Sequence, residues 1–182
     1  LRLGYVVLAL LLFRVVWGVV GGRWSRFASF FYGPGRVLRY LRGQGEAQEH
    51  VGHNPLGALS VFALLGALLA QVLTGLMADD EIAFSGPLTR FVSGDTVAWA
   101  TSLHTDVGQW LLVALVALHL AAIAFYTHIK RHSLVRPMVL GDKQLPASTP
   151  ASRDDARTRV LAAVVLAAAA GVAWWVAQLG VF

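Results

Sequence analysis

The sequence predicts an all-α membrane protein, in which a bundle of four transmembrane helices crosses a lipid bilayer. Of its 182 residues, 57% are hydrophobic and only 14% are charged, whereas about a quarter of the residues of a soluble domain are charged. The hydrophobic residues gather in four blocks, each close to the roughly 20 residues that span a bilayer core. The segments between the blocks carry most of the charged residues. Together these observations exclude an ordinary soluble domain.

The four blocks define the expected transmembrane spans. They lie at residues 3–22, 55–77, 102–126 and 160–182. The first block contains one charged residue, Arg14, and the second contains none. Pro55 opens the second block, where proline suits the first turn of a helix because its missing N–H would be unpaired there. Trp174 and Trp175 lie near the end of the last block and are typical of the membrane–water interface.

We expect three segments along the chain. Residues 1–140 would form one transmembrane domain, residues 141–159 a flexible cytoplasmic linker, and residues 160–182 an additional C-terminal helix. The sequence begins with Leu1 inside an apolar run, so we expect an upstream part to be missing from it.

The charges of the connecting segments predict the orientation in the membrane. Residues 23–54 and 127–159 contain more Lys and Arg than Asp and Glu, whereas residues 78–101 carry four acidic residues and Arg90. Lys and Arg concentrate in cytoplasmic loops. We therefore expect residues 23–54 and 127–159 to be cytoplasmic and residues 78–101 to be periplasmic, in a bacterial inner membrane.

The composition also excludes several kinds of chemistry. The chain has no Cys, which excludes disulfides, iron–sulfur clusters held by thiolates and covalently attached c-type haem. The net charge of +5 does not indicate nucleic-acid binding, because the basic residues lie in loops between apolar blocks. We predict no catalytic residue.

Two histidines of the third block are the strongest candidates for cofactor ligands. His104 and His119 are 15 residues apart, which is about 22 Å along one helix and leaves their side chains within about 60° of one another. Ionisable residues inside a membrane are candidates for function, and imidazole is a standard axial ligand of haem iron. Gly108, one turn beyond His104, would let a flat macrocycle lie close to the backbone.

Other interpretations of these histidines stay open. They can be interfacial residues that hydrogen-bond neighbouring helices, members of a proton relay, or ligands of another metal. Asp106 would relay protons or cap the helix.

Two further residues stand out. Arg14 lies deep in the first block and needs a partner. A haem propionate is one candidate. Alternatively, the side chain extends toward the interface, where it meets water and lipid headgroups. His53 would contact a propionate or a quinone, or serve as a third ligand; alternatively it belongs to a polar helix start with Asn54 as the N-cap.

The remaining histidines are expected to carry no function. His128 and His132 follow the third block beside basic residues and would lie at a solvated cytoplasmic rim. His50 is expected in a loop.

Four stretches of sequence carry a resemblance to a known family. They are GYVVLALLLFRVVWG (residues 4–18), GHNPLGALSV (52–61), TGLMADD (74–80) and SLHTDVGQWLLVALVALHLAAIAFY (102–126). In these stretches the chain resembles the bacterial cytochrome b561 / nickel-hydrogenase b-type cytochrome family, and the resemblance covers nearly all of residues 1–140. The FRxxWG and GHNPLG elements are the specific ones, and the region after about Asp142 is variable in that family.

The resemblance implies a helix bundle with two b haems, one near each face of the membrane. It implies that His104 ligates the outer haem and His119 the cytoplasmic one. The family's other two ligands lie in a further first helix and at the outer start of the next helix, upstream of Leu1. The full-length protein is therefore expected to have five spans, one of them upstream. The given residues would then offer one imidazole per haem, unless His53 substitutes on the cytoplasmic side.

The leading hypothesis is transmembrane electron transfer by a cytochrome rather than by a catalyst in its own right. The resemblance implies haem b and a quinone as cofactors, and as partners the lipid bilayer and a hydrogenase- or dehydrogenase-type redox subunit. The alternatives are a haem-free membrane anchor and a proton or cation transporter that uses Asp106 and the intramembrane histidines. A transporter needs further polar residues in the other helices. The second and fourth blocks offer only Ser60, Gln71, Thr74 and Gln178.

Overall fold

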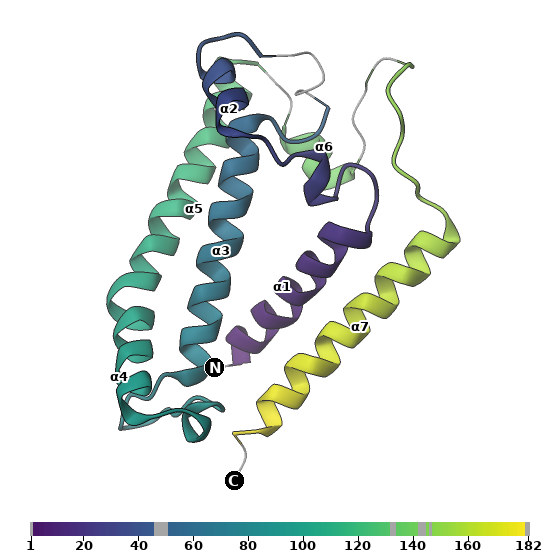
Figure 1. Cartoon of the computed structure of the whole chain (residues 1–182). Helices are drawn as coiled ribbons and strands as arrows, with labels where there is room; N and C mark the ends of the chain where they lie inside the picture. Colours follow the sequence, from purple (N-terminus) through teal and green to yellow (C-terminus); the bar gives the residue numbers. More distant parts are fainter. Residues whose placement is uncertain (1, 46–50, 132–133, 142–144, 146, 181–182) are drawn as a thin grey trace.

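The structure, a computed structural model, consists of helices joined by loops (Figure 1). It describes residues 2–45, 51–131, 134–141, 145 and 147–180. Among these residues, four helices are long and apolar enough to cross a membrane, with mean hydropathies of 2.1 to 2.3. They are α1 (Arg2–Val20), α3 (Pro55–Met77), a continuous helix Gly94–Ile129, and α7 (Ala156–Gln178). The predicted all-α bundle with four membrane spans is confirmed.

Helix α3 begins and ends at the predicted residues, Pro55 and Met77. Its start is fixed by the hydrogen bonding of its first turn. The Oδ1 atom of Asn54 accepts a hydrogen bond of 2.7 Å from the backbone N–H of Gly57. This side-chain bond satisfies one of the free N–H groups at the start of the helix. Pro55 occupies the first turn, where it lacks the N–H that would otherwise be unpaired.

The Asn54 cap can be tested by unfolding. We expect Asn54→Ala to lower the free energy of unfolding by about 1 kcal/mol, because the Gly57 N–H loses its acceptor. Asn54→Ser keeps a capping oxygen and is expected to stay within a few tenths of a kcal/mol of the wild type. Thermal unfolding of both variants in detergent measures the difference, and equal melting temperatures would show that the cap does not stabilise α3.

The third span is longer than the predicted residues 102–126. It is continuous over 36 residues, Gly94–Ile129. Its parts are α4 (Gly94–Ser102), η4 (Leu103–Gly108), α5 (Gln109–Ala124) and η5 (Phe125–Ile129), of which η4 and η5 are π-helical. The start lies earlier because the Ser93 Oγ accepts a bond of 3.3 Å from the Thr96 N–H. The helix is about 54 Å long, which exceeds the roughly 30 Å thickness of the bilayer core, so it extends beyond the apolar layer.

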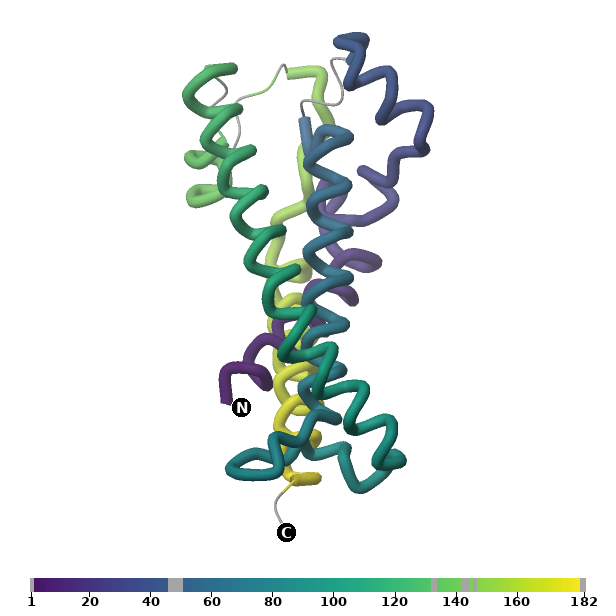
Figure 2. The backbone as a smooth tube through the Cα atoms, turned by 90° about the vertical axis from the view of Figure 1, so that its left-hand side faces the viewer, coloured from purple at the N-terminus to yellow at the C-terminus, as the bar shows by residue number. Residues whose placement is uncertain are grey.

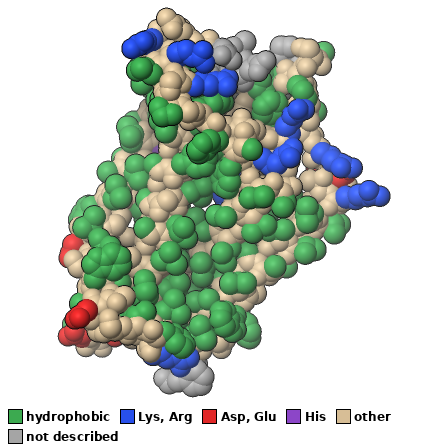
Figure 3. All heavy atoms as spheres, viewed as in Figure 1, with side chains coloured by type: hydrophobic (Ala, Val, Ile, Leu, Met, Phe, Trp, Pro, Cys, Tyr) green, Lys and Arg blue, Asp and Glu red, His purple; other side chains and the backbone are tan. Residues whose placement is uncertain are grey.

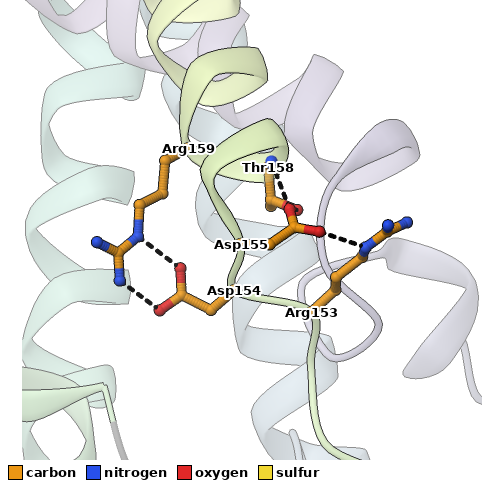
Figure 4. Close-up of polar contacts among 5 residues, drawn as sticks. All are labelled: Arg153, Asp154, Asp155, Thr158 and Arg159. Carbon is orange, nitrogen blue, oxygen red and sulfur yellow. Dashed lines mark hydrogen bonds and ion pairs between the residues drawn. The ribbon is translucent and has the colours of Figure 1, made fainter.

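Helix α7 also starts earlier than the predicted residue 160, and it ends at Gln178. The carboxylate of Asp155 accepts hydrogen bonds of 2.9 and 2.8 Å from the backbone N–H and the hydroxyl of Thr158 (Figure 4). This cap fixes the first helical residue at Ala156. The hydrophobic pattern places the start too late because Arg157 and Arg159 lie in the first turn.

The helices pack as a bundle in which α7 takes part. Helix α1 packs along α7, and α3 packs against both α1 and α5 (Figures 1 and 2). The buried cluster at their centre contains Leu8 and Leu11 of α1, Val72 and Leu76 of α3, and Ala173 of α7. The small side chains Ala169 and Ala173 are buried, which lets the backbones of α1 and α7 approach closely.

The two ends of the bundle differ in charge. The short helices α2 (Pro34–Leu41) and α6 (Val135–Leu140) lie at one end, which we call the Arg-rich end (Figure 1). The loop of residues 78–93 lies at the other end, which we call the acidic end. In Figure 3, Lys and Arg side chains gather toward the first end and Asp and Glu toward the second, with hydrophobic side chains covering the face between them. That apolar face suits contact with lipid chains.

Candidate functional site

The ring of His104 points at α3 near the acidic end. Its Nδ1 atom lies 2.9 Å from the backbone carbonyl oxygen of Gln71. Because a carbonyl oxygen can only accept a hydrogen bond, Nδ1 carries the proton and Nε2 keeps its lone pair. This is the tautomer in which a histidine binds a metal through Nε2.

Gly75 makes room for the His104 ring. A Cβ atom at position 75 would lie 2.6 Å from Cε1 and 3.0 Å from Nδ1 of His104. His104 also lies in the π-helical segment η4, and such segments occur frequently at functional sites in other proteins. The position of this ring therefore depends on α3 as much as on its own helix.

His119 repeats this arrangement toward the Arg-rich end. Its Nδ1 atom lies 3.1 Å from the hydroxyl oxygen of Ser60 on α3. A hydroxyl can donate or accept a hydrogen bond; in the tautomer in which it accepts from Nδ1, Nε2 of His119 keeps its lone pair. Both histidines thus contact α3.

His53 lies just before α3 in an aromatic cluster. Its ring centroid is 4.5 Å from that of the buried Phe30, and its carbonyl oxygen accepts a bond of 2.9 Å from the hydroxyl of Tyr32. Within the part of the chain that the structure describes, its buried Nδ1 atom has no hydrogen-bond partner. Burial lowers the pKa of His53, and the electrostatic effects of the nearby Arg14 and His119 lower it further. A half-buried imidazole with a lowered pKa and a ring nitrogen that has no partner among the described residues can bind a metal.

Arg14 extends from α1 toward the Arg-rich end. Its Nη1 donates a hydrogen bond of 3.3 Å to the carbonyl oxygen of Ser25, and its guanidinium lies 4.7 Å from the ring centroid of Phe27. Both partners belong to the segment that follows α1. This direction agrees with the interface interpretation of Arg14, and the bond to a propionate stays a prediction.

The space beside Gly108 is filled by a side chain of α3. A Cβ atom at position 108 would collide with Oε1 of Gln71. The Nε2 of the same amide donates a bond of 3.0 Å to the carbonyl oxygen of His104, and Oε1 has no partner among the described residues. Gly108 thus permits close approach of α3, and its expected role beside a macrocycle stays a prediction.

The structure gives Asp106 no role as a helix cap. The helix begins at Gly94, well before Asp106, so the interpretation of Asp106 as a helix cap is wrong. The carboxylate is exposed and accepts bonds of 3.0 Å from Ser102 and 2.8 Å from Thr105, both on its own helix. His128 is exposed, as expected. The other two peripheral histidines, His50 and His132, lie outside the described residues.

The predicted site residues fall into two groups. Arg14 and His119 lie close enough to His53 to lower its pKa, and these three form one group toward the Arg-rich end. His104 and Gly108 lie with Gln71 toward the acidic end. In the described part of the chain, no three His, Asp or Glu side chains converge to hold a bare metal ion. The candidate ligands are single imidazoles, and single imidazoles are what an axial site on haem requires.

The partners of the two histidines on α3 are the residues that sequence reasoning missed. Ser60 and Gln71 are 11 residues apart, which is about three helical turns and places them on one face. With Thr74, whose hydroxyl lies 3.5 Å from Nδ1 of His104, they are the polar side chains of the central span. Their common face was a signal that α3 meets the histidines.

The sequence was compared with known proteins. Residues 2–141 match the model of a family described as prokaryotic cytochrome b561. Similar curated proteins include "Probable Ni/Fe-hydrogenase B-type cytochrome subunit" of Bradyrhizobium diazoefficiens, 28% identical over 78% of this chain and 63% of that protein. The same description applies to relatives from Azotobacter chroococcum (28% identical, 81% and 68% covered) and Rhodobacter capsulatus (28%, 71% and 55%). The chain thus spans about two thirds or less of these relatives, and no solved structure matches it.

Proposed function

Because this chain belongs to the prokaryotic cytochrome b561 family, we propose that it carries electrons across a membrane through haem b. The observation that carries the proposal is the pair of imidazoles that one long helix directs at α3. Nδ1 of His104 donates to a backbone carbonyl oxygen of α3, and Nδ1 of His119 lies at a hydroxyl of α3 that can accept its proton. In this tautomer Nε2 of each ring is left for iron.

His104 is proposed to hold a haem nearer the acidic end, and His119 a haem nearer the Arg-rich end. A bound haem supplies a one-electron carrier whose potential depends on its axial ligands and surroundings. The Gln71 carbonyl and the Ser60 hydroxyl orient the two rings and raise their basicity. Fifteen residues separate the two ligands by about 22 Å along the helix, which is most of the roughly 30 Å bilayer core.

A bound haem would take a second ligand from the protein, and the family resemblance implies that these second ligands lie outside the given residues. Within the described residues, His53 is the candidate to serve the haem on His119. Its side chain is half-buried, its buried Nδ1 has no partner among the described residues, and it lies close enough to Arg14 and His119 for them to lower its pKa. Arg14 is proposed to pair with a propionate of the same haem, and Gly108 to border the haem on His104.

The orientation follows from the distribution of charge. We propose that residues 23–54 and 127–159 face the cytoplasm of a bacterium and residues 78–101 the outer side of its inner membrane, since Lys and Arg concentrate in cytoplasmic loops. The haem on His104 would then lie nearer the outer surface. The names of the relatives suggest a Ni/Fe-hydrogenase as the electron donor, and a quinone is proposed as the acceptor.

The function is tested by the absorption of the complete gene product, purified with its partner or studied in its own membranes. A dithionite-reduced-minus-oxidised spectrum is expected to show sharp b-type α and Soret bands. Hydrogen gas is expected to reduce the same bands in membranes that contain the hydrogenase and not in membranes that lack it. A folded protein without haem bands would leave a membrane anchor or a transporter, whereas haem that hydrogen does not reduce would contradict the proposed donor.

The Ser60 hydroxyl gives a test confined to one haem. We expect Ser60→Ala to raise the midpoint potential of the haem on His119 by roughly 40 mV, because a lost hydrogen bond of about 1 kcal/mol makes the imidazole a weaker donor to ferric iron. The potential of the other haem should not change. Spectroelectrochemical titration measures both, with Ser102→Ala as the control because Ser102 bonds to Asp106 rather than to an imidazole. A shift in both haems would contradict the assignment of Ser60 to His119.

A further inference from the structure

A pocket of about 480 Å³ opens at the Arg-rich end, between the last turn of α1 and the first turns of α7. This volume lies within the roughly 300–1,000 Å³ typical of small-molecule sites. Four arginines line it: Arg23 and Arg26 from the segment after α1, and Arg153 and Arg157 from the start of α7. Segments far apart in the sequence thus bring four guanidinium groups to one pocket.

Among the described residues, most of this positive charge has no acidic partner. Asp155 pairs with Arg153 at 2.8 Å, and Asp154 pairs with Arg159, outside the pocket, at 2.9 Å (Figure 4). The other three pocket arginines, Arg23, Arg26 and Arg157, form no ion pair with any described residue. Figure 3 shows Lys and Arg side chains grouped along this side of the Arg-rich end.

The pocket also has an apolar part, which lies on the side of the two membrane-spanning helices. Val20, at the end of α1, and Leu161, in the second turn of α7, line it and are 49% and 42% exposed. Polar groups at the mouth and exposed apolar side chains on the membrane side match a ligand with an anionic head and a hydrocarbon tail. A soluble anion would use the arginines and leave the apolar part uncovered.

The two walls of the pocket are held together by Trp24. Its indole N–H donates a bond of 3.0 Å to the carbonyl oxygen of Pro150, and its backbone N–H donates one of 3.4 Å to the hydroxyl of Ser152. These bonds join the segment after α1 to the segment before α7. The arginines are thus positioned by the fold itself.

We propose that this pocket binds the phosphate of an anionic phospholipid from the leaflet at the Arg-rich end, with an acyl chain lying over Val20 and Leu161. Guanidinium groups bind phosphate oxygens in a bidentate manner, and basic pockets between transmembrane helices are suited to anionic headgroups. The bound lipid would bridge α1 and α7, the helix pair that closes the bundle on this side. Among the described residues, none of the residues that line the pocket is hydrogen-bonded to or stacked on a histidine.

The proposal is tested by native mass spectrometry of the complete gene product, released from nanodiscs of phosphatidylcholine that contain phosphatidylglycerol as a minor component. The wild type is expected to retain phosphatidylglycerol in preference to phosphatidylcholine. The double variant Arg23→Gln/Arg157→Gln is expected to lose this preference by about tenfold or more, since each arginine near the surface contributes to anionic lipid binding.

The matched control removes two charges from the same end outside the pocket. Arg131→Gln/Arg136→Gln is expected to weaken retention by about threefold at most, through loss of general surface potential alone. Equal losses in the two double variants would overturn the site in favour of unspecific attraction. Full competition by inorganic phosphate or by soluble glycerol phosphate would overturn the lipid assignment and leave an anion site. Equal retention of the two lipids by the wild type would contradict the proposal outright.

Discussion

Replacement of His104 or His119 by Leu in the complete gene product is expected to remove one b haem each, and replacement of both to abolish the haem bands. The reason is geometric, because each imidazole is the one candidate ligand that the third span directs at its end of α3. Leu has no lone pair to offer iron and has a side-chain volume that the site can hold. Haem content per protein, measured as the pyridine haemochrome, should fall by about half in each single variant if two haems bind.

The matched control is His128→Leu. His128 lies on the same continuous helix but is exposed in η5, so its replacement is expected to leave the haem content unchanged. Equal losses in all three variants would indicate misfolding rather than lost ligands, and far-ultraviolet circular dichroism separates these cases. If the Leu variants do not fold, His104→Met and His119→Met serve instead, because a methionine ligand retains haem and raises its potential.

The same variants decide between the proposed functions. A haem-free anchor predicts that all three Leu variants differ from the wild type in packing alone. A transporter predicts that Asp106→Asn lowers proton or cation transport more than either ligand variant does. In the structure, the Asp106 side chain is exposed and bonded to its own helix. Full haem content in both single variants would contradict the assignment of His104 and His119.

Much of the fold could be predicted from the sequence, because a membrane span is a property of a local stretch. The bounds of α3 agree to the residue, since Asn54 and Pro55 define its start and the apolar run ends at Met77. The starts of the third and fourth spans were placed too late, at residues 102 and 160. In both cases a cap, Ser93 or Asp155, begins the helix among polar residues that a hydrophobic pattern does not count.

The candidate site was predicted less completely, because contacts between helices are not local. The spacing of His104 and His119 predicted a common face, and both contact α3. The spacing did not identify what they meet there, namely Gln71 and Ser60. The spacing also did not indicate that Gly108 faces the Gln71 amide. That contact depends on the relative shift of two helices along their axes and on the π-helical turn of η4.

Gly75 provides the sharpest test of the packing around His104. We expect Gly75→Ala to lower the free energy of unfolding by about 1–3 kcal/mol, because the new methyl group would overlap the imidazole ring. The ring is also held by its bond to Gln71, so it cannot move without losing that partner. Occupancy of the haem on His104 is expected to fall in parallel, and Gly75→Leu should remove that haem.

Gly66 on the same helix is the matched control. A Cβ atom at position 66 would meet nothing within 4 Å. Gly66→Ala is therefore expected to raise the free energy of unfolding by about 0.5–1 kcal/mol, through the higher helix propensity of Ala, and to leave the haem content unchanged. Thermal unfolding and the pyridine haemochrome measure both quantities, and indistinguishable results for the two Ala variants would contradict the packing of His104 on Gly75.

A double-mutant cycle separates the contact with His104 from other effects of a larger side chain at position 75. In a His104→Ala background the ring is absent, so Gly75→Ala should cost little and should gain the helix propensity of Ala. The coupling free energy between positions 75 and 104 is therefore expected to be about 1–3 kcal/mol. Because the His104→Ala background has already lost its ligand, stability rather than haem is the quantity to compare. A cost at position 75 that persists without the ring would place its origin in the packing of the α3 backbone, and Gly75 would then have no part in positioning the ligand.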